Sequence, residues 1–296
     1  MLDLASLARI WETHGADLKP PTRFELRGVR FDHHPQTALM GVVNRSADSW
    51  YRESVSLSTE AAIRRGKRLF ADGAAIVDLG AESTVLDADR VDADGQKSAL
   101  LPIIEALAGS GGIVSAETYD LSVAEACLDA GAAILNLTSA QETESFYKLA
   151  AERDAGVVIC FVKGRNVRDV DDFAVTDDHA SVLHDYFARE AELAAAAGVS
   201  RIWLDPGLGF YYRNLQDSAE RVRYQMKTFL TSFPLCKLGW PICQALPHAF
   251  EFFEDEVRCA EPFFAVLAAL GHTDLIRTHE VSRVRGVLQT MAAFES

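Results

Sequence analysis

Short apolar runs alternate with longer stretches of helical periodicity along most of the chain. Near-continuous apolar strands of about four to eight residues are typical of a parallel sheet that helices cover. Most of the helical stretches end on glycine, which is a common C-terminal stop. The runs that predict strands are residues 38–43, 74–79, 112–116, 132–137, 156–162, 201–204, 235–238 and 274–276.

This repetition predicts an α/β fold, a closed parallel (β/α)8 barrel of the TIM type. The alternative is an open doubly wound sheet, but no G-x-G-x-x-G follows the first run, which reads LMGVVNRSADSW. Barrels of about 250 residues form one domain. We therefore expect residues 38–296 to be the barrel. Residues 1–37 read as an N-terminal extension with a helix and a hairpin.

Composition narrows the classes of partner. The chain of 296 residues has a formal net charge of −14, which argues against nucleic-acid and anionic-membrane binding. Its five cysteines contain no CxxC pair and do not read as a disulfide framework. No apolar run approaches about 18 residues, and the first residues do not read as a signal peptide. We expect a cytoplasmic protein with reduced thiols and no membrane partner.

Polar residues follow several of the predicted strands. In a (β/α)8 barrel the C-terminal ends of all strands meet at one rim, where catalysis takes place. Each such residue alone could simply cap the following helix. As a set they predict a site of carboxylates, amides and cations. The set comprises Asn44, Glu82, Ser83, Thr84, Glu117, Thr118, Asn136, Asp205, Arg277 and His279.

Five segments resemble the dihydropteroate synthase, or pterin-binding, family. MGVVNRSADSW is similar to its first-loop signature, and DGAAIVDLGAEST to its D(I/V)GGEST segment. IVSAETYDLSVAEACLDAGAAILNLTS resembles its SVDTY…IND stretch. WLDPGLGF and LIRTHEV resemble its DPG-(I/L)-GF and RVHDV blocks. The resemblances run from Met40 to Val281 in the family's order, so the chain is identified as a divergent member.

The resemblance implies a transferase of folate biosynthesis that joins a dihydropterin pyrophosphate to p-aminobenzoate, or a related aromatic amine, and releases pyrophosphate. A pterin presents a hydrogen-bonding edge like that of guanine, which a carboxylate and an amide can pair with. The pyrophosphate needs cations or a metal. The implied pterin-binding residues are Glu117, Asn136 and Asp205. Those implied for catalysis are Asn44, Arg277 and His279. The resemblance implies that Asn44 also binds Mg2+. Asp48, Ser49, Ser83 and Thr84 are implied as loops for phosphate and the second substrate.

Two family cations are missing. Val85 stands where the family has the arginine of ESTRPG. In the seventh strand the family has G-x-SRK, and we align Pro241, Ile242 and Cys243 with its serine, arginine and lysine. Loss of one charged transition-state donor costs about a hundredfold or more. Arg45, Lys163, Arg165 and Arg213 are candidate replacement cations, although each reads more simply as a solvated loop charge.

Three functions therefore compete. The first is a dihydropteroate synthase or close relative that uses Mg2+. The second is a pterin-dependent methyltransferase, which needs no pyrophosphate site. The third is a non-catalytic paralogue that binds a pterin. The resemblance also implies a homodimer, for which the apolar stretch FFAVLAALG is suited.

Overall fold

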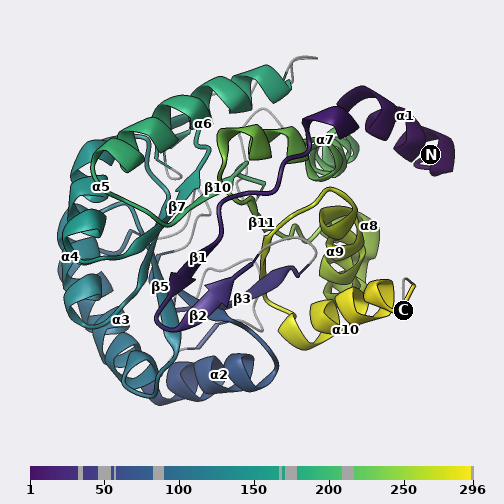
Figure 1. Ribbon diagram of the computed structural model, residues 1–296. Helices are drawn as coiled ribbons and strands as arrows, with labels where there is room; N and C mark the ends of the chain where they lie inside the picture. Colours follow the sequence, from purple (N-terminus) through teal and green to yellow (C-terminus); the bar gives the residue numbers. More distant parts are fainter. Residues whose placement is uncertain are drawn as a thin grey trace.

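Eight parallel strands form a barrel surrounded by helices in the computed structural model, so the predicted fold class is confirmed (Figure 1). The structure describes residues 1–32, 36–45, 55–56, 58–82, 90–166, 169–170, 179–208 and 217–294. The strand order is β10-β7-β6-β5-β4-β3-β12-β11. A parallel bridge between Leu204 and Ile242 joins the two outer strands of this order and closes the barrel. The strands are β3 (Ala38–Asn44), β4 (Ile76–Gly80), β5 (Ile113–Thr118), β6 (Ile134–Leu137), β7 (Gly156–Cys160), β10 (Ile202–Asp205), β11 (Cys243–Ala245) and β12 (Leu275–Thr278).

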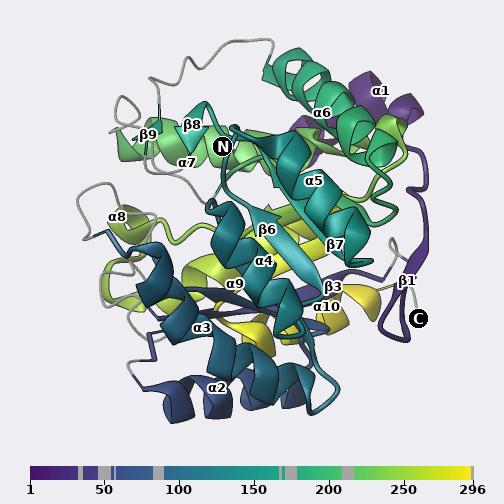
Figure 2. The same ribbon diagram turned by 90° about the vertical axis from the view of Figure 1, so that its left-hand side faces the viewer.

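The helices form a ring outside the strands because their apolar faces pack against the outward side chains of the sheet (Figures 1 and 2). Gly41 of β3 shows how close this packing is, since a Cβ at Gly41 would lie 3.0 Å from Val281 and 3.1 Å from Leu69. The helices are α2 (Thr59–Ala71), α3 (Ala93–Ala108), α4 (Leu121–Asp129), α5 (Thr143–Glu152), α6 (His179–Ala196), α7 (Ser218–Thr231), α8 (Phe250–Phe253), α9 (Ala260–Leu270) and α10 (Val281–Ala292).

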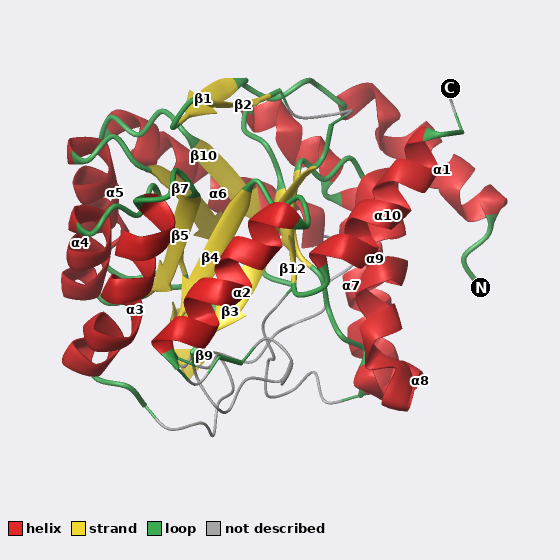
Figure 3. Ribbon diagram, turned by 90° about the horizontal axis from the view of Figure 1, so that it is seen from below, coloured by secondary structure: helices red, strands yellow, loops and turns green. Residues whose placement is uncertain are grey.

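The N-terminal segment closes one end of the barrel. It contains α1 (Leu4–His14) and an antiparallel hairpin of β1 (Phe24–Leu26) and β2 (Val29–Phe31), as predicted. Rings of Phe24 and Phe31 stand edge-on to the buried Trp203 near the start of β10, at 4.7 and 5.4 Å. The hairpin therefore covers the N-terminal ends of the strands, and Figures 2 and 3 show β9 and α8 at the opposite end.

The predicted strand at 235–238 is wrong. Those residues belong to a 3-10 helix, Phe233–Leu238, which has a proline in its first turn and ends at Gly239 with a φ of 84°. The seventh strand is β11, eight residues later. Its central residue, Gln244, is polar but buried, and its amide donates to Ser232 Oγ and Thr273 Oγ1, both at 2.9 Å. This buried glutamine hides the strand from a search for apolar runs.

The polar segment that follows β7 is partly described. Gly164–Asn166 and Asp169–Val170 form a short antiparallel pair, β8 and β9, and α6 begins at His179. Within the described part of the chain, no helix combines the length and apolarity that crossing a bilayer requires.

Candidate active site

Five polar side chains from five strands meet inside the barrel toward the C-terminal end of the sheet. They alternate with apolar residues that face the helices, as the two-residue period of a strand requires. Glu117, Asn136, Asp205 and Arg277 were predicted, and the structure brings them together. Asp78, in the middle of β4, is the fifth member.

Arg277 holds the carboxylates of two neighbouring strands. Its Nε donates to Asp78 Oδ2 at 2.7 Å, and its Nη2 donates to Glu117 Oε2 at 2.5 Å. Asp78 is fully buried, while the side chain of Arg277 is 16% exposed. Charge-assisted pairs of this kind are strong and directional. Arg277 is therefore fixed by the acidic wall of the site, and the predicted cation faces carboxylates of its own chain.

A chain of contacts continues from Asp78 to Asp205. The Nδ2 group of Asn136 donates to Asp78 Oδ2 at 3.1 Å, and the thiol of Cys160 lies 3.3 Å from Asn136 Oδ1. The same sulfur is 3.9 Å from Asp205 Oδ2, and Asp205 Oδ1 accepts the backbone N–H of Gly207 at 2.8 Å. These bonds fix the orientation of both the amide and the carboxylate.

Three carboxyl groups lie near one guanidinium, and the pKa values of two of them, Glu117 and Asp205, are raised. Burial raises the pKa of Glu117 to about 7. Arg277 pulls it down, while Asp78 and Asp205 push it further up. Burial raises the pKa of Asp205 to about 6. The hydrogen bond from the Gly207 N–H has the opposite effect and lowers this pKa. Burial disfavours a charge on Arg277, but Glu117 and Asp78 raise its pKa above the usual value. The cluster therefore carries an excess of acidic groups.

Two features mark this cluster as a place for a polar ligand. Oδ1 of Asp78 is buried, and no hydrogen-bond donor meets it among the residues that the structure describes. An unsatisfied buried oxygen is costly unless a bound molecule supplies the donor. Beside it, a Cβ at Gly80 would lie 3.5 Å from Glu117 Oε2 and 3.8 Å from Asn44 Oδ1. Both oxygens therefore border the space that the glycine leaves open.

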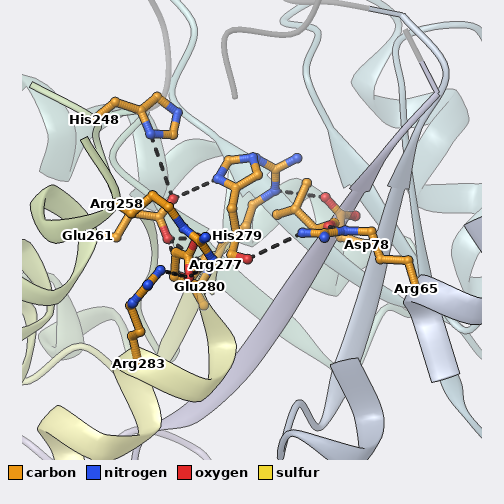
Figure 4. A network of polar contacts seen from close by, with 11 residues as sticks. Arg65, Asp78, His248, Arg258, Glu261, Arg277, His279, Glu280 and Arg283 are labelled. Carbon is orange, nitrogen blue, oxygen red and sulfur yellow. Dashed lines mark hydrogen bonds and ion pairs between the residues drawn. The ribbon is translucent and has the colours of Figure 1, made fainter. Parts of the chain in front are cut away.

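His279 lies two residues beyond Arg277 and belongs to a second cluster (Figure 4). Its Nδ1 is 2.7 Å from Oε1 of Glu261, a fully buried residue in the first turn of α9. His248 Nδ1 lies 3.7 Å from the same oxygen. Burial lowers the pKa of His248 to about 4, and the neighbouring His279 adds to this effect. Burial opposes ionisation of Glu261, but His279 brings its pKa below the usual value.

Of the candidate replacement cations, Arg45, Lys163 and Arg165 lie within the described residues. A guanidinium nitrogen of Arg45 donates to the carbonyl of Ser56 just beyond β3. Lys163 and Arg165 lie at the start of the β8–β9 segment, and the Arg165 carbonyl accepts the N–H of Ala140 at 2.9 Å. The following predicted residues lie outside the described residues: Asp48, Ser49, Ser83, Thr84, Val85 and Arg213.

Cys243, which we align with the lysine of the G-x-SRK motif, does not lie at the C-terminal rim of the barrel. Cys243 is the first residue of β11, it pairs with Leu275 inside the barrel, and burial raises its thiol pKa well above 9.0. Ala245 pairs with Arg277, so the strand reaches the rim there. From this register we infer that the motif aligns with Ala245–Ala249, with Pro247, His248 and Ala249 in place of serine, arginine and lysine.

Three site residues were missed by sequence reasoning. Asp78 is a charge in the middle of an apolar strand, and Glu261 is a charge at the start of an apolar helix; both are fully buried. Such residues are rare unless paired, which is the signal that could have found them. His248 was hidden by the misplaced seventh strand.

Known proteins resemble the chain in both sequence and structure. Residues 40–240 match the family described as "Pterin binding enzyme". Dihydropteroate synthase of Streptococcus pyogenes serotype M6 is 31% identical over 209 residues, which cover 69% of this chain and 73% of the relative. Dihydropteroate synthase of Xanthomonas albilineans, solved with 4-aminobenzoic acid, is 25% identical, has a TM-score of 0.76, and covers 93% of this chain and 99% of its own. The Thermus thermophilus enzyme in complex with 6HMPPP has a TM-score of 0.72 at 25% identity, over 92% and 99% of the two chains.

Proposed function

The chain belongs to the pterin-binding enzyme family, and from that premise we propose that it is a dihydropteroate synthase. The reaction joins a dihydropterin pyrophosphate to p-aminobenzoate, or a related aromatic amine, and releases pyrophosphate. The observation that carries the proposal is the buried set of Asp78, Asn136 and Asp205 at the C-terminal end of the barrel. The synthases among its relatives favour this function over the methyltransferase and over the non-catalytic paralogue.

The ring would bind through its amino-pyrimidine edge, which carries adjacent N–H donors and a carbonyl acceptor, as guanine does. Asp205 offers a carboxylate for the donors, and Asn136 offers an amide held in place by Asp78 and Cys160. Oδ1 of Asp78, which meets no hydrogen-bond donor among the described residues, is a further acceptor for a ring N–H. These groups are fixed before the ligand arrives, which lowers the entropic cost of binding.

The surplus of carboxylates suits the reaction. The carbon–oxygen bond of the dihydropterin breaks with positive charge developing on the pterin, and fixed negative groups stabilise such a charge in a site that excludes water. Glu117 and Asp205 are the carboxyls whose pKa values, about 7 and about 6, lie near neutral pH. Both sit beside Asp78, so together they provide the negative field.

The opposite end of the substrate carries the leaving pyrophosphate. We propose that Arg277 and His279 contact it at the rim, and that Asn44 orients it from the end of β3. Asp48, Ser49, Ser83 and Thr84 stay predictions for the surrounding loops.

Mg2+ fits the same end. It prefers oxygen ligands and is commonly held by one or two protein groups together with substrate phosphates. Asn44 Oδ1 and Glu117 Oε2 supply two oxygens at the edge of the open space above Gly80. When bound there, the ion would supply positive charge to the leaving pyrophosphate.

Turnover of dihydropterin pyrophosphate with p-aminobenzoate, followed by pyrophosphate release and by formation of dihydropteroate, tests the proposal. We expect activity that Asp205→Ala abolishes together with pterin binding. Asp129→Ala, at the exposed end of α4, is the matched control and should leave both intact. Pterin binding without turnover would refute the synthase assignment, and unchanged pterin affinity in Asp205→Ala would refute the role of Asp205.

We also propose a cytoplasmic homodimer. The cysteines are free, which suits a reducing compartment. On α9, Phe263 and Leu270 are 40% and 43% exposed, and they supply apolar area for a second copy. Light scattering coupled to gel filtration should give twice the monomer mass, and Phe263→Lys should reduce it. A monomer at micromolar concentration would contradict the homodimer.

A further inference from the structure

Three side chains with metal-binding atoms converge beside the site (Figure 4). His248 follows β11, Glu261 lies in α9, and His279 follows β12. One donor atom of each lies within 4.8 Å of the others. The two imidazole Nδ1 atoms are 2.7 and 3.7 Å from Glu261 Oε1. Zinc bonds of about 2.0–2.2 Å in a tetrahedron place neighbouring donors about 3.3 Å apart, which lies between these distances.

The other oxygen of Glu261 is anchored. Oε2 accepts the backbone N–H groups of His279 at 2.9 Å and of Glu280 at 3.1 Å, and it also accepts the hydroxyl of Thr278. Ligand carboxylates are typically oriented by such outer hydrogen bonds. Oε1 is therefore the oxygen turned toward both imidazoles, and rotation of the carboxylate would break the three bonds to Oε2.

The four described arginines around the cluster have partners. Arg277 is paired with Asp78 and Glu117, Arg258 and Arg283 are both paired with Glu280, and Arg65 donates to the carbonyls of Val42 and His279. The side chains of His248 and His279 are 11% and 10% exposed, so the buried carboxylate is reached from the rim.

We propose that His248, Glu261 and His279 bind a divalent transition metal of the zinc class. Two nitrogen donors and one carboxylate suit zinc, cobalt or nickel and do not suit Mg2+, so this site is distinct from the magnesium position near Asn44. Three protein ligands leave a fourth position open. If the proposed function holds, an oxygen of the pyrophosphate would occupy that position. The metal would then supply the charge that the family's arginine and lysine provide and that His248 and Ala249 do not.

Cobalt titration of the metal-free chain at about pH 7.5 tests the site. We expect one Co2+ per chain with the intense visible absorption of a low-coordinate site, and displacement of Co2+ by Zn2+. Removal of an outer-shell partner weakens metal sites about 10- to 100-fold, so removal of a ligand should cost at least the upper value. The variants are His248→Ala, which leaves the hydrogen bonds of Glu261 Oε2 in place, and Glu261→Gln. His184→Ala, on the exposed face of α6, is the matched control and should bind as the parent does.

Folding of every variant is checked by circular dichroism and urea denaturation. Absence of the cobalt band, or equal cobalt affinity in the parent and in correctly folded His248→Ala, would overturn the proposal. Glu261 would then only orient His279 through a hydrogen bond. Pterin binding by the metal-free chain is measured in parallel, so failure of the metal site and failure of the pterin assignment are told apart. A cobalt spectrum that pyrophosphate leaves unchanged would reject the phosphate role alone.

Discussion

Removal of Arg277 should destabilise the protein strongly, and by an amount that depends on pH. In Arg277→Met, Asp78 and Glu117 each lose a charge-assisted hydrogen bond, at 2.7 and 2.5 Å in the parent. Such bonds contribute about 1.5–3 kcal/mol each, and breaking a buried ion pair costs about 3–5 kcal/mol. We therefore expect a loss of about 3–5 kcal/mol in the free energy of unfolding at about pH 8, where the carboxyls are ionised.

The loss in the free energy of unfolding of Arg277→Met should become smaller when the pH is lowered. The folded-state pKa of Glu117 is about 7, above its ordinary value of 4.5, so the folded protein holds an extra proton between these values. Stability therefore falls as pH rises through this window. Arg277 lowers the folded-state pKa of Glu117, so this pKa should be higher in the variant and the pH window should extend further up. Acidification therefore restores more stability to the variant than to the parent. One proton across one pH unit is about 1.4 kcal/mol, and the losses at about pH 8 and 5.5 should differ by at least that amount.

Urea denaturation of the parent, Arg277→Met, Glu117→Gln and the double variant at both pH values measures this effect. The double-mutant cycle should give a coupling of about 1–3 kcal/mol at the higher pH, since removal of both partners leaves no charge from that pair. An equal loss at the two pH values, or a coupling near zero, would refute the idea that Arg277 holds ionised carboxylates.

Three further predictions concern packing, pH and the seventh strand. A Cβ at Gly271 would lie 1.8 Å from a backbone oxygen of α7, so Gly271→Ala should lower the free energy of unfolding by at least about 1–3 kcal/mol. Gly286 has open space around it, so Gly286→Ala should be neutral or stabilising in urea denaturation. The pKa of Asp205 is about 6, and its ionised form would accept the ring N–H groups. The pterin affinity, measured by calorimetry, should therefore fall about tenfold between pH 7 and pH 5. An affinity that does not change with pH would contradict the role of Asp205. Cys243→Lys should unfold the protein by placing a charge inside the barrel, and a thermal melt like that of the parent would restore the original alignment.

The barrel itself follows from the sequence. The period of the apolar runs is a local property, because each strand must bury both of its faces and each helix one face. Seven of the eight predicted runs coincide with strands of the closed sheet. The exception, β11, shows where this reasoning stops. The amide nitrogen of Gln244 donates to Ser232 and Thr273, which lie in other segments of the chain, so no local pattern reveals that a strand can contain this residue.

The residues expected to bind the ring, Glu117, Asn136 and Asp205, also came from the sequence, since all three lie within motifs. Only the tertiary structure decided what these residues face. Arg277 lies 160 positions from Glu117 and 199 from Asp78, and those two contacts pair the proposed phosphate-binding cation with an acidic wall. Glu261, absent from every motif, joins two histidines in the same way. Motifs specify which groups reach the rim. Which charged side chains pair with one another depends on the distances between them, and those distances are set when the barrel closes.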